Sequence, residues 1–456
     1  MPKESKGVRL DHISKIYKDP KTGKDFYAVH DVSLDIQPGS FVTLLGPSGC
    51  GKTTTLRMVA GFESPDEGEI YLGGEPINAL TPNKRDTAMV FQSYALFPHY
   101  NVFDNVAYGL RLRKVPKPEI ERRVKEILEL VEIMRNLTRE GKSVILITHK
   151  LKEIKECADK CTIIRQGKYI STVNVSDVTE HDLASMMVGR NVEFTVDKAP
   201  IQPGETVLSV RDLHARDYRK VEVLRGLSID VRRGEIVGIA GIDGNGQTEL
   251  VEILTGLKKA THGSVTMNGQ DAYNKSPRYL YELGISSIPA DRQKHGLILD
   301  FSVEDNLILQ NYEEQPYSRN HLFNREAIFA HATQSIQNYD IRPQNSERRT
   351  AGTLSGGNQQ KVIIAREVQN DKDLLIAVNP TRGLDVGAIE YVHKYIVEQR
   401  NKGKAVLLVS FELDEIMSLS DKIDVIFDGR IVASIPGEEA TENQLGLLMA
   451  GGKVNG

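Results

Sequence analysis

The sequence predicts an α/β protein with two domains in tandem. An apolar run, a glycine loop and a helix-favouring segment follow one another at residues 41–60 and again at 235–254, about 195 residues later. A repeat of this length indicates duplicated domains and excludes a solenoid. The length of 456 residues also exceeds one hydrophobic core. Because strands alternate with helices in both halves, we expect largely parallel sheets, with ligands at the carboxyl ends of the strands.

A short segment with the composition of a linker separates the halves. Residues 197–205 contain two prolines and a glycine, which interrupt regular structure. We therefore predict a first domain over 1–196 and a second domain over 206–456.

Composition and charge narrow the class of protein. Hydrophobic residues make up 40% and charged residues 26%, as in ordinary globular proteins. No run reaches the roughly 18 apolar residues that span a bilayer. The polar start shows no secretory leader, so we expect a cytoplasmic protein with at most a peripheral membrane role. A net charge of -4 provides no basic face for nucleic acid, and three cysteines without clustered histidines do not supply four zinc ligands.

The first glycine loop matches the phosphate-binding pattern G-x-x-x-x-G-K-[ST]. Backbone N–H groups of such a loop surround phosphate oxygens, and the following helix directs its positive N-terminus at them. Lys52 would reach the outer phosphates and Thr53 would ligate Mg²⁺. A chance glycine turn is the alternative, which the flanking strand and helix disfavour. The predicted ATP-binding residues are Gly46, Pro47, Ser48, Gly49, Cys50, Gly51, Lys52, Thr53 and Thr54.

The second glycine loop lacks the lysine. Gln247 takes its position, and Asp243 adds a negative charge. Because the loop keeps its backbone donors but loses the cation, weak or structural nucleotide binding is expected there rather than turnover. This degenerate loop comprises Gly241, Gly244, Gly246, Gln247 and Thr248.

Two further segments of the first half carry recognisable patterns. Gln92 lies within Met89-Val-Phe-Gln-Ser-Tyr-Ala-Leu-Phe-Pro98, and an apolar run over 144–148 leads to His149. With the glycine loop, they resemble the Q-loop and switch-histidine strand of ABC transporter ATP-binding subunits. The resemblance implies that Gln92 senses Mg²⁺ and the attacking water and that His149 contacts the γ-phosphate. It also places Tyr17 where the family stacks an aromatic ring on adenine, although a lone tyrosine is more often only packed.

The second half carries a segment similar to the signature sequence of the same family. The resemblance implies that its glycines let a helix N-terminus approach a γ-phosphate bound by the opposite domain, with Ser355 donating a hydrogen bond. The two domains would then pair within the chain, so that Lys52, Gln92 and His149 face this segment. Its residues are Leu354, Ser355, Gly356, Gly357, Asn358 and Gln359.

At other family positions of the second half, the expected catalytic side chains are replaced by residues of a different type. Val378 and Asn379 replace the Asp-Glu pair that normally ends the strand before the catalytic centre. Phe411 stands at the position of the switch histidine, and Arg292 lies within the segment that replaces the Q-loop glutamine. Such a degenerate domain resembles the tandem ATPases of monosaccharide and nucleoside importers, most closely the nucleoside branch.

The middle part of the first domain has fewer residues than the same part of the second domain. Lys52 and His149 are 97 positions apart, whereas Gln247 and Phe411 are 164 apart, a difference of 67. The missing part should carry a signature sequence and the strand with the Mg²⁺-binding Asp and catalytic Glu. Residues up to about 132 resemble spermidine-, iron- or maltose-type ATPases, and later ones the nucleoside type. We therefore hypothesise a junction of two related genes near 131–134. The predicted fold is two P-loop NTPase domains in tandem, the first internally truncated.

The resemblance implies an ATP-binding and ATP-hydrolysing subunit, with ATP and Mg²⁺, that energises an ABC importer of nucleosides or sugars. It would lie on the cytoplasmic face of the plasma membrane, docked on permease subunits through Phe97, Pro98 and Phe103, and would act indirectly with a solute-binding protein. A nucleotide-binding pseudoenzyme or non-functional fusion product is the alternative, because the catalytic carboxylates are missing. A soluble tandem ABC protein of ribosomes or DNA is disfavoured, since it usually has two intact sites.

Overall fold

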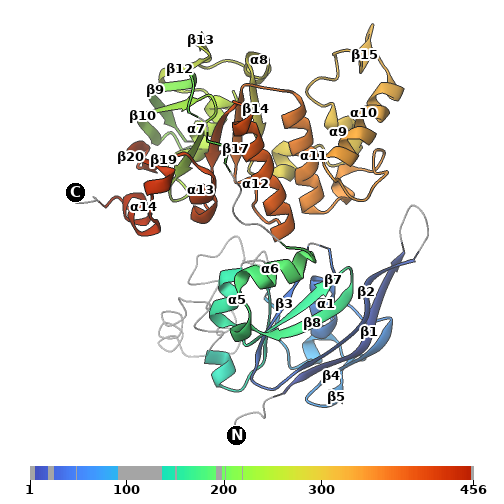
Figure 1. Ribbon diagram of the computed structural model, residues 1–456. Helices are drawn as coiled ribbons and strands as arrows, with labels where there is room; N and C mark the ends of the chain where they lie inside the picture. The colour runs from blue at the N-terminus through green and yellow to red at the C-terminus, as the bar shows by residue number, and fades with distance from the viewer. Residues whose placement is uncertain are drawn as a thin grey trace. The chain divides into compact units, whose positions relative to one another are not determined.

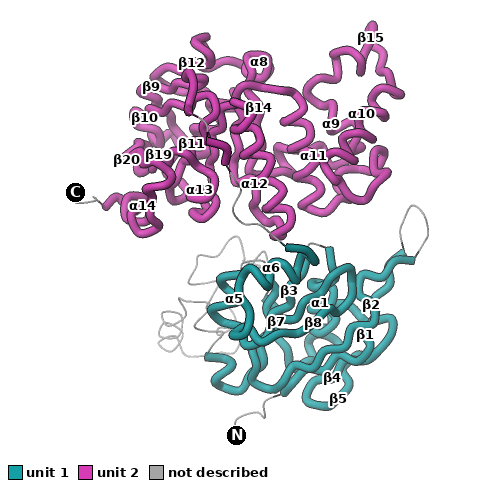
Figure 2. Tube along the Cα trace, in the orientation of Figure 1, with its two compact units in different colours: residues 1–192 teal, residues 193–456 magenta. Residues whose placement is uncertain are grey.

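A computed structural model describes residues 6–18, 25–47, 49–90, 136–148, 151–191, 198–200, 202–217 and 219–452. The chain forms two compact units, residues 1–192 and residues 193–456 (Figures 1 and 2). Each unit is described by itself below. Within the described residues, no helix has the length and apolar character needed to cross a membrane.

The first unit contains two four-stranded sheets. One is antiparallel, in the order β2-β1-β4-β5, and the other has the order β6-β3-β7-β8 with β3 parallel to both of its neighbours. The strands are β1 (Val8–Lys18), β2 (Asp25–Ile36), β3 (Phe41–Leu45), β4 (Glu67–Leu72), β5 (Glu75–Pro76), β6 (Val144–Ile147), β7 (Lys160–Arg165) and β8 (Lys168–Asn174).

The described helices of the first unit include α1 (Lys52–Ala60), α5 (Leu151–Cys157) and α6 (Glu180–Val188). The buried core lies between the antiparallel sheet, β3 and α1, where apolar side chains alternate inward along β1 and β2. This core holds α1, and therefore the glycine loop before it, against the end of β3.

The second unit repeats this plan and extends it. Its antiparallel sheet has the order β10-β9-β12-β13, and its larger sheet has the order β14-β17-β18-β11-β19-β20, in which only β20 runs antiparallel to its neighbour. These strands are β9 (Thr206–Arg216), β10 (Glu222–Arg232), β11 (Ile236–Ala240), β12 (His262–Met267), β13 (Gln270–Asp271), β14 (Ile285–Ile288), β17 (Leu374–Val378), β18 (Ala405–Val409), β19 (Lys422–Phe427) and β20 (Arg430–Pro436).

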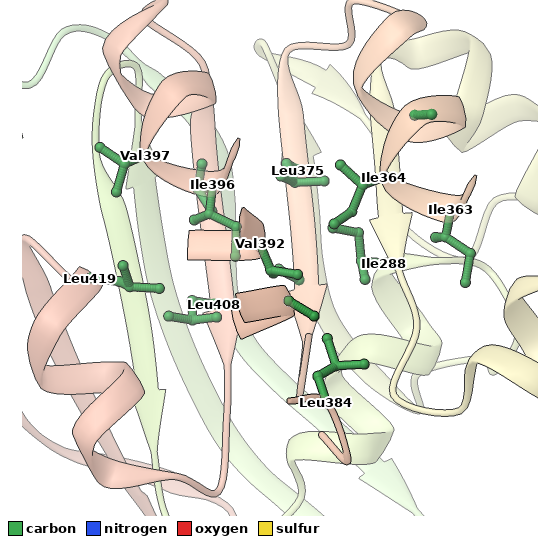
Figure 3. Close-up of a cluster of buried hydrophobic side chains, with 14 of the residues drawn as sticks. Ile288, Ile363, Ile364, Leu375, Leu384, Val392, Ile396, Val397, Leu408 and Leu419 are labelled. Atoms are coloured by element: carbon green, nitrogen blue, oxygen red, sulfur yellow. The ribbon is translucent and has the colours of Figure 1, made fainter. Parts of the chain in front are cut away.

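Helices pack against the larger sheet of the second unit. Figure 3 shows Ile364 of α11, Ile396 of α12 and Leu419 of α13 directed towards Leu375 and Leu408 of the sheet, and all five are buried. The helices are α7 (Gln247–Leu254), α8 (Pro277–Leu283), α9 (Val303–Leu307), α10 (Arg325–Asn338), α11 (Gly356–Gln369), α12 (Val386–Asn401), α13 (Leu413–Leu419) and α14 (Glu442–Met449), and the short strands β15 (Ser318–Arg319) and β16 (Leu322–Phe323) precede α10.

The expectation of largely parallel sheets needs a correction. Each unit pairs one mainly parallel sheet with a separate antiparallel sheet. The sequence pattern reveals strands by alternation of apolar residues, but the direction of pairing depends on partners that are distant along the chain.

The two units differ at one edge of the larger sheet. By order and pairing, β6 of the first unit corresponds to β18 of the second, which lies between β17 and β11. Within the described residues, β6 pairs with β3 alone, and its four residues are only half-buried, whereas all five of β18 are buried. The described part of the first unit thus shows no counterpart of β17 or β14.

Candidate nucleotide-binding sites

Close backbone approaches require two glycines of the first loop. The loop leaves the end of β3, and Gly51 caps α1 with a φ of 100°. A Cβ at Gly46 would collide with the carbonyl oxygen of Ile164 in β7, and one at Gly51 with that of Ala28 in β2. Gly49 has a φ of 75° and open space around it. The backbones of two strands therefore pack closely against the loop, and among the described residues no side chain caps the helix that follows.

The Lys52 side chain folds back over this loop. Its Nζ donates to the carbonyl oxygens of Gly46 at 2.6 Å and Pro47 at 2.8 Å. The neighbouring Cys50 is buried, and burial raises the pKa of its thiol although Lys52 opposes this shift. A single positive charge thus lies in a glycine loop at a helix N-terminus, an arrangement that fits phosphate groups.

The hydroxyl-bearing residues that follow begin α1. Thr53 is exposed and Thr54 half-buried in the first turn, while Thr55 Oγ1 donates to Gly51 O at 3.0 Å. An exposed hydroxyl beside the lysine is the group that a Mg²⁺ ion would use in a phosphate loop. Ser48 lies outside the described residues, as do Gln92 and His149.

Tyr17 lies on the strand pair that supports the first loop. It is opposite Phe26 in β2, two residues before Ala28, which contacts Gly51. The ring centroids of Tyr17 and Phe26 are 5.9 Å apart, and Lys15 Nζ lies 5.6 Å from the Tyr17 ring. Tyr17 is half-buried, so the structure gives it a partner while its role in base stacking remains a prediction.

The second loop has the same backbone form. Gly246 caps α7 with a φ of 105°, and a Cβ there would lie 2.9 Å from the carbonyl oxygen of Val223 in β10. Gly241 is equally crowded, since its Cβ would lie 2.6 Å from Gln247 Nε2, whereas Gly244 has open space. The glycines therefore keep their structural roles, and Thr248 follows in the first turn of α7.

Gln247 changes the chemistry of that loop. Only 2% of the residue is exposed, and Nε2 donates to Ile242 O at 3.1 Å. Its Oε1 is buried and has no hydrogen-bond partner among the described residues. A buried acceptor replaces the cation, and phosphate oxygens, which also accept hydrogen bonds, are disfavoured beside it.

Sequence reasoning missed a second replacement at this site. His12 and Asp212 are equivalent irregular positions of β1 and β9, with φ values of 50° and 46°. Five residues beyond each stand Tyr17 and Asp217. Asp217 accepts hydrogen bonds from the backbone N–H groups of Arg219 and Val221 and closes a turn. The signal was available, because counting from the repeated bulge aligns the two positions.

The signature-like segment forms the start of α11. Leu354 is buried, Ser355 occupies the N-cap position, and Asn358 Nδ2 donates to Ser355 Oγ at 2.9 Å. Gln359 Nε2 donates to Ala351 O at 3.2 Å. Gly357 is buried, and a Cβ on it would lie 3.3 Å from Ala388 Cβ, so α12 passes close to the start of the helix.

Arg292 reaches this helix start from the segment that replaces the Q-loop. Its Nη1 donates to Arg382 O at 2.9 Å, and its Nη2 would lie 2.6 Å from a Cβ on Gly356. Burial lowers the pKa of the Arg292 guanidinium. Arg292 therefore contacts both the segment that contains Arg382 and the start of α11.

A family model matches the chain, and similar proteins include three importer subunits. The model described as ABC transporter matches residues 29–147 and 224–382. The guanosine import ATP-binding protein NupO of Bacillus subtilis is 42% identical over 511 aligned residues, which cover 98% of this chain and 100% of that protein. The nucleoside import ATP-binding protein NupA of Lactococcus lactis is 41% identical, covering 94% and 96%. The glucose import ATP-binding protein TsgD13 of Haloferax volcanii is 35% identical, covering 98% and 96%.

Proposed function

The chain belongs to the ABC transporter family of ATP-binding proteins, and we propose that it is the subunit whose ATP binding and hydrolysis energise the import of a nucleoside or sugar. The tandem α/β fold predicted from the sequence is confirmed by the two matched segments of the family. Relatives with the names of guanosine, nucleoside and glucose import proteins support the solute class. The same relatives, matched along nearly their whole length, do not favour the alternative of a pseudoenzyme.

The position of Lys52 carries the proposal. Its ammonium group lies within hydrogen-bond distance of two carbonyl oxygens of a glycine loop, and the helix after this loop has no side-chain cap in the described part of the chain. ATP phosphates would exchange those contacts, in which only the donor is charged, for contacts in which donor and acceptor carry opposite charges. We assign the first loop as the higher-affinity nucleotide site and the Gln247 loop as the weaker one.

Hydrolysis at this site would need Mg²⁺ and a positioned water. Thr53 is exposed beside Lys52 and would hold the metal together with Gln92, and His149 would contact the γ-phosphate. Mg²⁺ would neutralise developing charge on the phosphates. Because the expected carboxylates are missing from the sequence, we propose slow hydrolysis, with a loss on the order of 10² to 10⁴ in rate.

A deletion in the first domain is consistent with the relatives. The alignment with NupO spans 511 positions, so at least 55 of them (511 minus 456) have no residue in this chain. Strand β6 is half-buried, whereas the corresponding strand β18 is fully buried. This difference is what the loss of a neighbouring strand would produce. The gene junction near 131–134 lies outside the described residues and remains a hypothesis.

The proposed partners are the permease subunits of an importer and, through them, a solute-binding protein. The chain would act as a peripheral subunit on the cytoplasmic face of the membrane. The candidate permease contacts Phe97, Pro98 and Phe103 lie outside the described residues. Pairing of the two domains around ATP likewise remains a proposal.

Matched substitutions at the two loops test the proposed function. We expect Lys52→Ala to weaken ATP binding at least tenfold and to abolish ATP hydrolysis, because it removes the cation from the loop. Gln247→Ala should change both only slightly. Equal binding by wild type and Lys52→Ala would contradict the proposal, and a larger effect of Gln247→Ala would reverse the assignment of the two loops.

A further inference from the structure

The hydroxyl group of Ser355 is used differently from those of the residues that cap α6, α8, α9 and α14, each of which accepts a backbone N–H of its helix. An N-cap oxygen normally accepts a backbone N–H from the first helical turn. Ser355 has the extended backbone of an N-cap, yet among the described residues its side chain makes no capping bond to α11. Its Oγ instead accepts the side-chain amide of Asn358 at 2.9 Å. Asn358 therefore draws the serine oxygen away from the helix backbone.

Two other helices show the outcome when a carboxylate takes the place of that amide. Before α6, Thr179 Oγ1 accepts Asp182 N at 3.1 Å and donates to Asp182 Oδ2 at 2.7 Å. Before α9, Ser302 Oγ accepts Asp305 N at 3.1 Å and donates to Asp305 Oδ2 at 2.6 Å. In both, the hydroxyl proton points inward, at the carboxylate. In these two helices an aspartate three positions after the cap thus sets the direction of the hydroxyl proton.

The orientation of the Asn358 amide follows from its second contact. Asn358 Oδ1 accepts the backbone N–H of Arg342 at 2.7 Å. A backbone N–H can only donate, so the oxygen of the amide must face Arg342 and its nitrogen must face Ser355. Flipping the amide would set two donors against each other at Arg342 and break that bond, so the contact with Arg342 fixes the orientation.

The segment that carries Arg342 is itself held against α11. Lys361 Nζ, one turn beyond Asn358, donates to Asp340 O at 2.7 Å and to Asp340 Oδ2 at 2.9 Å. Arg342 Nε donates to Asp340 Oδ1 at 3.0 Å. The acceptor side of Asn358 is therefore anchored at a fixed place on the helix.

We propose that Asn358 is a positioning residue that keeps the Ser355 proton directed outward. A hydroxyl that accepts a hydrogen bond from an amide still has its own proton to donate. That proton would serve the γ-phosphate oxygen that the signature resemblance assigns to Ser355. The inference rests on the proposed function, since it needs ATP as the ligand.

Asn358→Asp in the full chain tests the proposal, because it should weaken ATP binding without lowering stability. A carboxylate at this position should turn the serine proton inward, as Asp182 and Asp305 do. We expect ATP affinity to fall about tenfold, the loss of one hydrogen bond to a charged group, while ADP affinity stays unchanged. The melting temperature should hold or rise, because an acidic residue in the first turn stabilises a helix. Both affinities are measured by displacement of a fluorescent ATP analogue with Mg²⁺.

Two further variants separate proton direction from charge and from folding. Asn358→Leu removes the donor without adding a charge and should also lower ATP affinity but not ADP affinity. If Asn358 acts only through Ser355, Asn358→Leu should not lower ATP affinity further in a protein that already carries Ser355→Ala. The effects of the two substitutions on ATP affinity should therefore be fully non-additive. Asp182→Asn is the matched control, which should lower stability and leave both affinities unchanged.

The outcomes distinguish this inference from the proposed function. If Lys52→Ala binds ATP as wild type does, the proposed function is wrong. If Lys52→Ala loses ATP while Asn358→Leu keeps the wild-type preference of ATP over ADP, only the role of Asn358 is overturned. An effect of Asn358→Leu that persists in Ser355→Ala would also overturn it, since Asn358 would then contact nucleotide directly.

Discussion

The side-chain oxygen of Asn379 accepts the backbone N–H of Phe411 at 3.0 Å. These are the positions at which the family resemblance places a catalytic carboxylate and a switch histidine. Asn379 is only 8% exposed and has a φ of 42°, and its own N–H donates to Val409 O at 2.7 Å. In the second unit the two positions thus connect the ends of β17 and β18.

The contact predicts that Asn379 stabilises the second unit. Asn379→Ala removes a buried hydrogen bond and places alanine in the left-handed region, so we expect a loss of about 2 kcal/mol in the free energy of unfolding. Urea denaturation measures it. The control is Asn345→Ala at an exposed residue with a φ of 60°, which should lose about half as much. Equal losses would show that only backbone conformation matters.

Gln247→Lys should create a stronger second nucleotide site. The two loops share their glycine geometry, so a lysine there should reach the carbonyl oxygens of Gly241 and Ile242 as Lys52 reaches those of Gly46 and Pro47. In a Lys52→Ala background, we expect ATP affinity to rise about tenfold from the added charge. Isothermal titration provides the measurement. No gain would indicate that Asp217 and Asp243 set the affinity of the second loop.

Arg85 should be essential to the helix that follows the first loop. Its buried guanidinium donates to Met58 O at 2.6 Å, Val59 O at 2.9 Å and Leu80 O at 2.9 Å. Because Arg85→Met removes three hydrogen bonds from a charged donor, although Gly61 N still donates to Met58 O, we expect a loss of about 3 kcal/mol and faster hydrogen exchange in α1. Arg57→Met is the control: its guanidinium is half-exposed and 3.8 Å from Glu63, so it should change stability by less than about 0.5 kcal/mol. A similar effect of both would refute the role of Arg85.

The first unit should open more easily than the second. Val144 to Ile147 of β6 are half-buried, whereas β18 is buried throughout. Amides of β6 should therefore exchange with solvent faster than those of β18, and limited proteolysis should cut the first unit first. Slower exchange in β6, or first cleavage in the second unit, would contradict this prediction.

His214 should make stability depend on pH. A hydrogen bond with Glu222 raises the pKa of His214, burial opposes the shift, and Asp212 adds to it. A raised pKa in the folded state stabilises the protein fully below the ordinary histidine value of 6.5, and the contribution disappears as pH rises through the folded value. His214→Gln should therefore lower the urea midpoint at pH 6 but not at pH 8.5. An equal effect at both pH values would show that the charge of His214 is not involved.

The sequence by itself determined the local chemistry of this protein. The strand over Phe41–Leu45, the glycine loop and the helix after it appear where the pattern predicts them, because a short apolar run and glycine act over a few residues. The repeat also predicted the second loop and the loss of its lysine. Ser48, Gln92 and His149 lie outside the described residues, and their roles remain predictions.

Only the tertiary structure decided how the replaced residues are used. Nothing in the sequence pairs Asn379 with Phe411, or Asn358 with Arg342, because each bond joins segments that only folding brings together. The antiparallel sheets and the exposure of β6 likewise depend on strand neighbours far along the chain. Sequence patterns record which residues favour burial or a turn, whereas hydrogen bonds between distant segments are specified by packing.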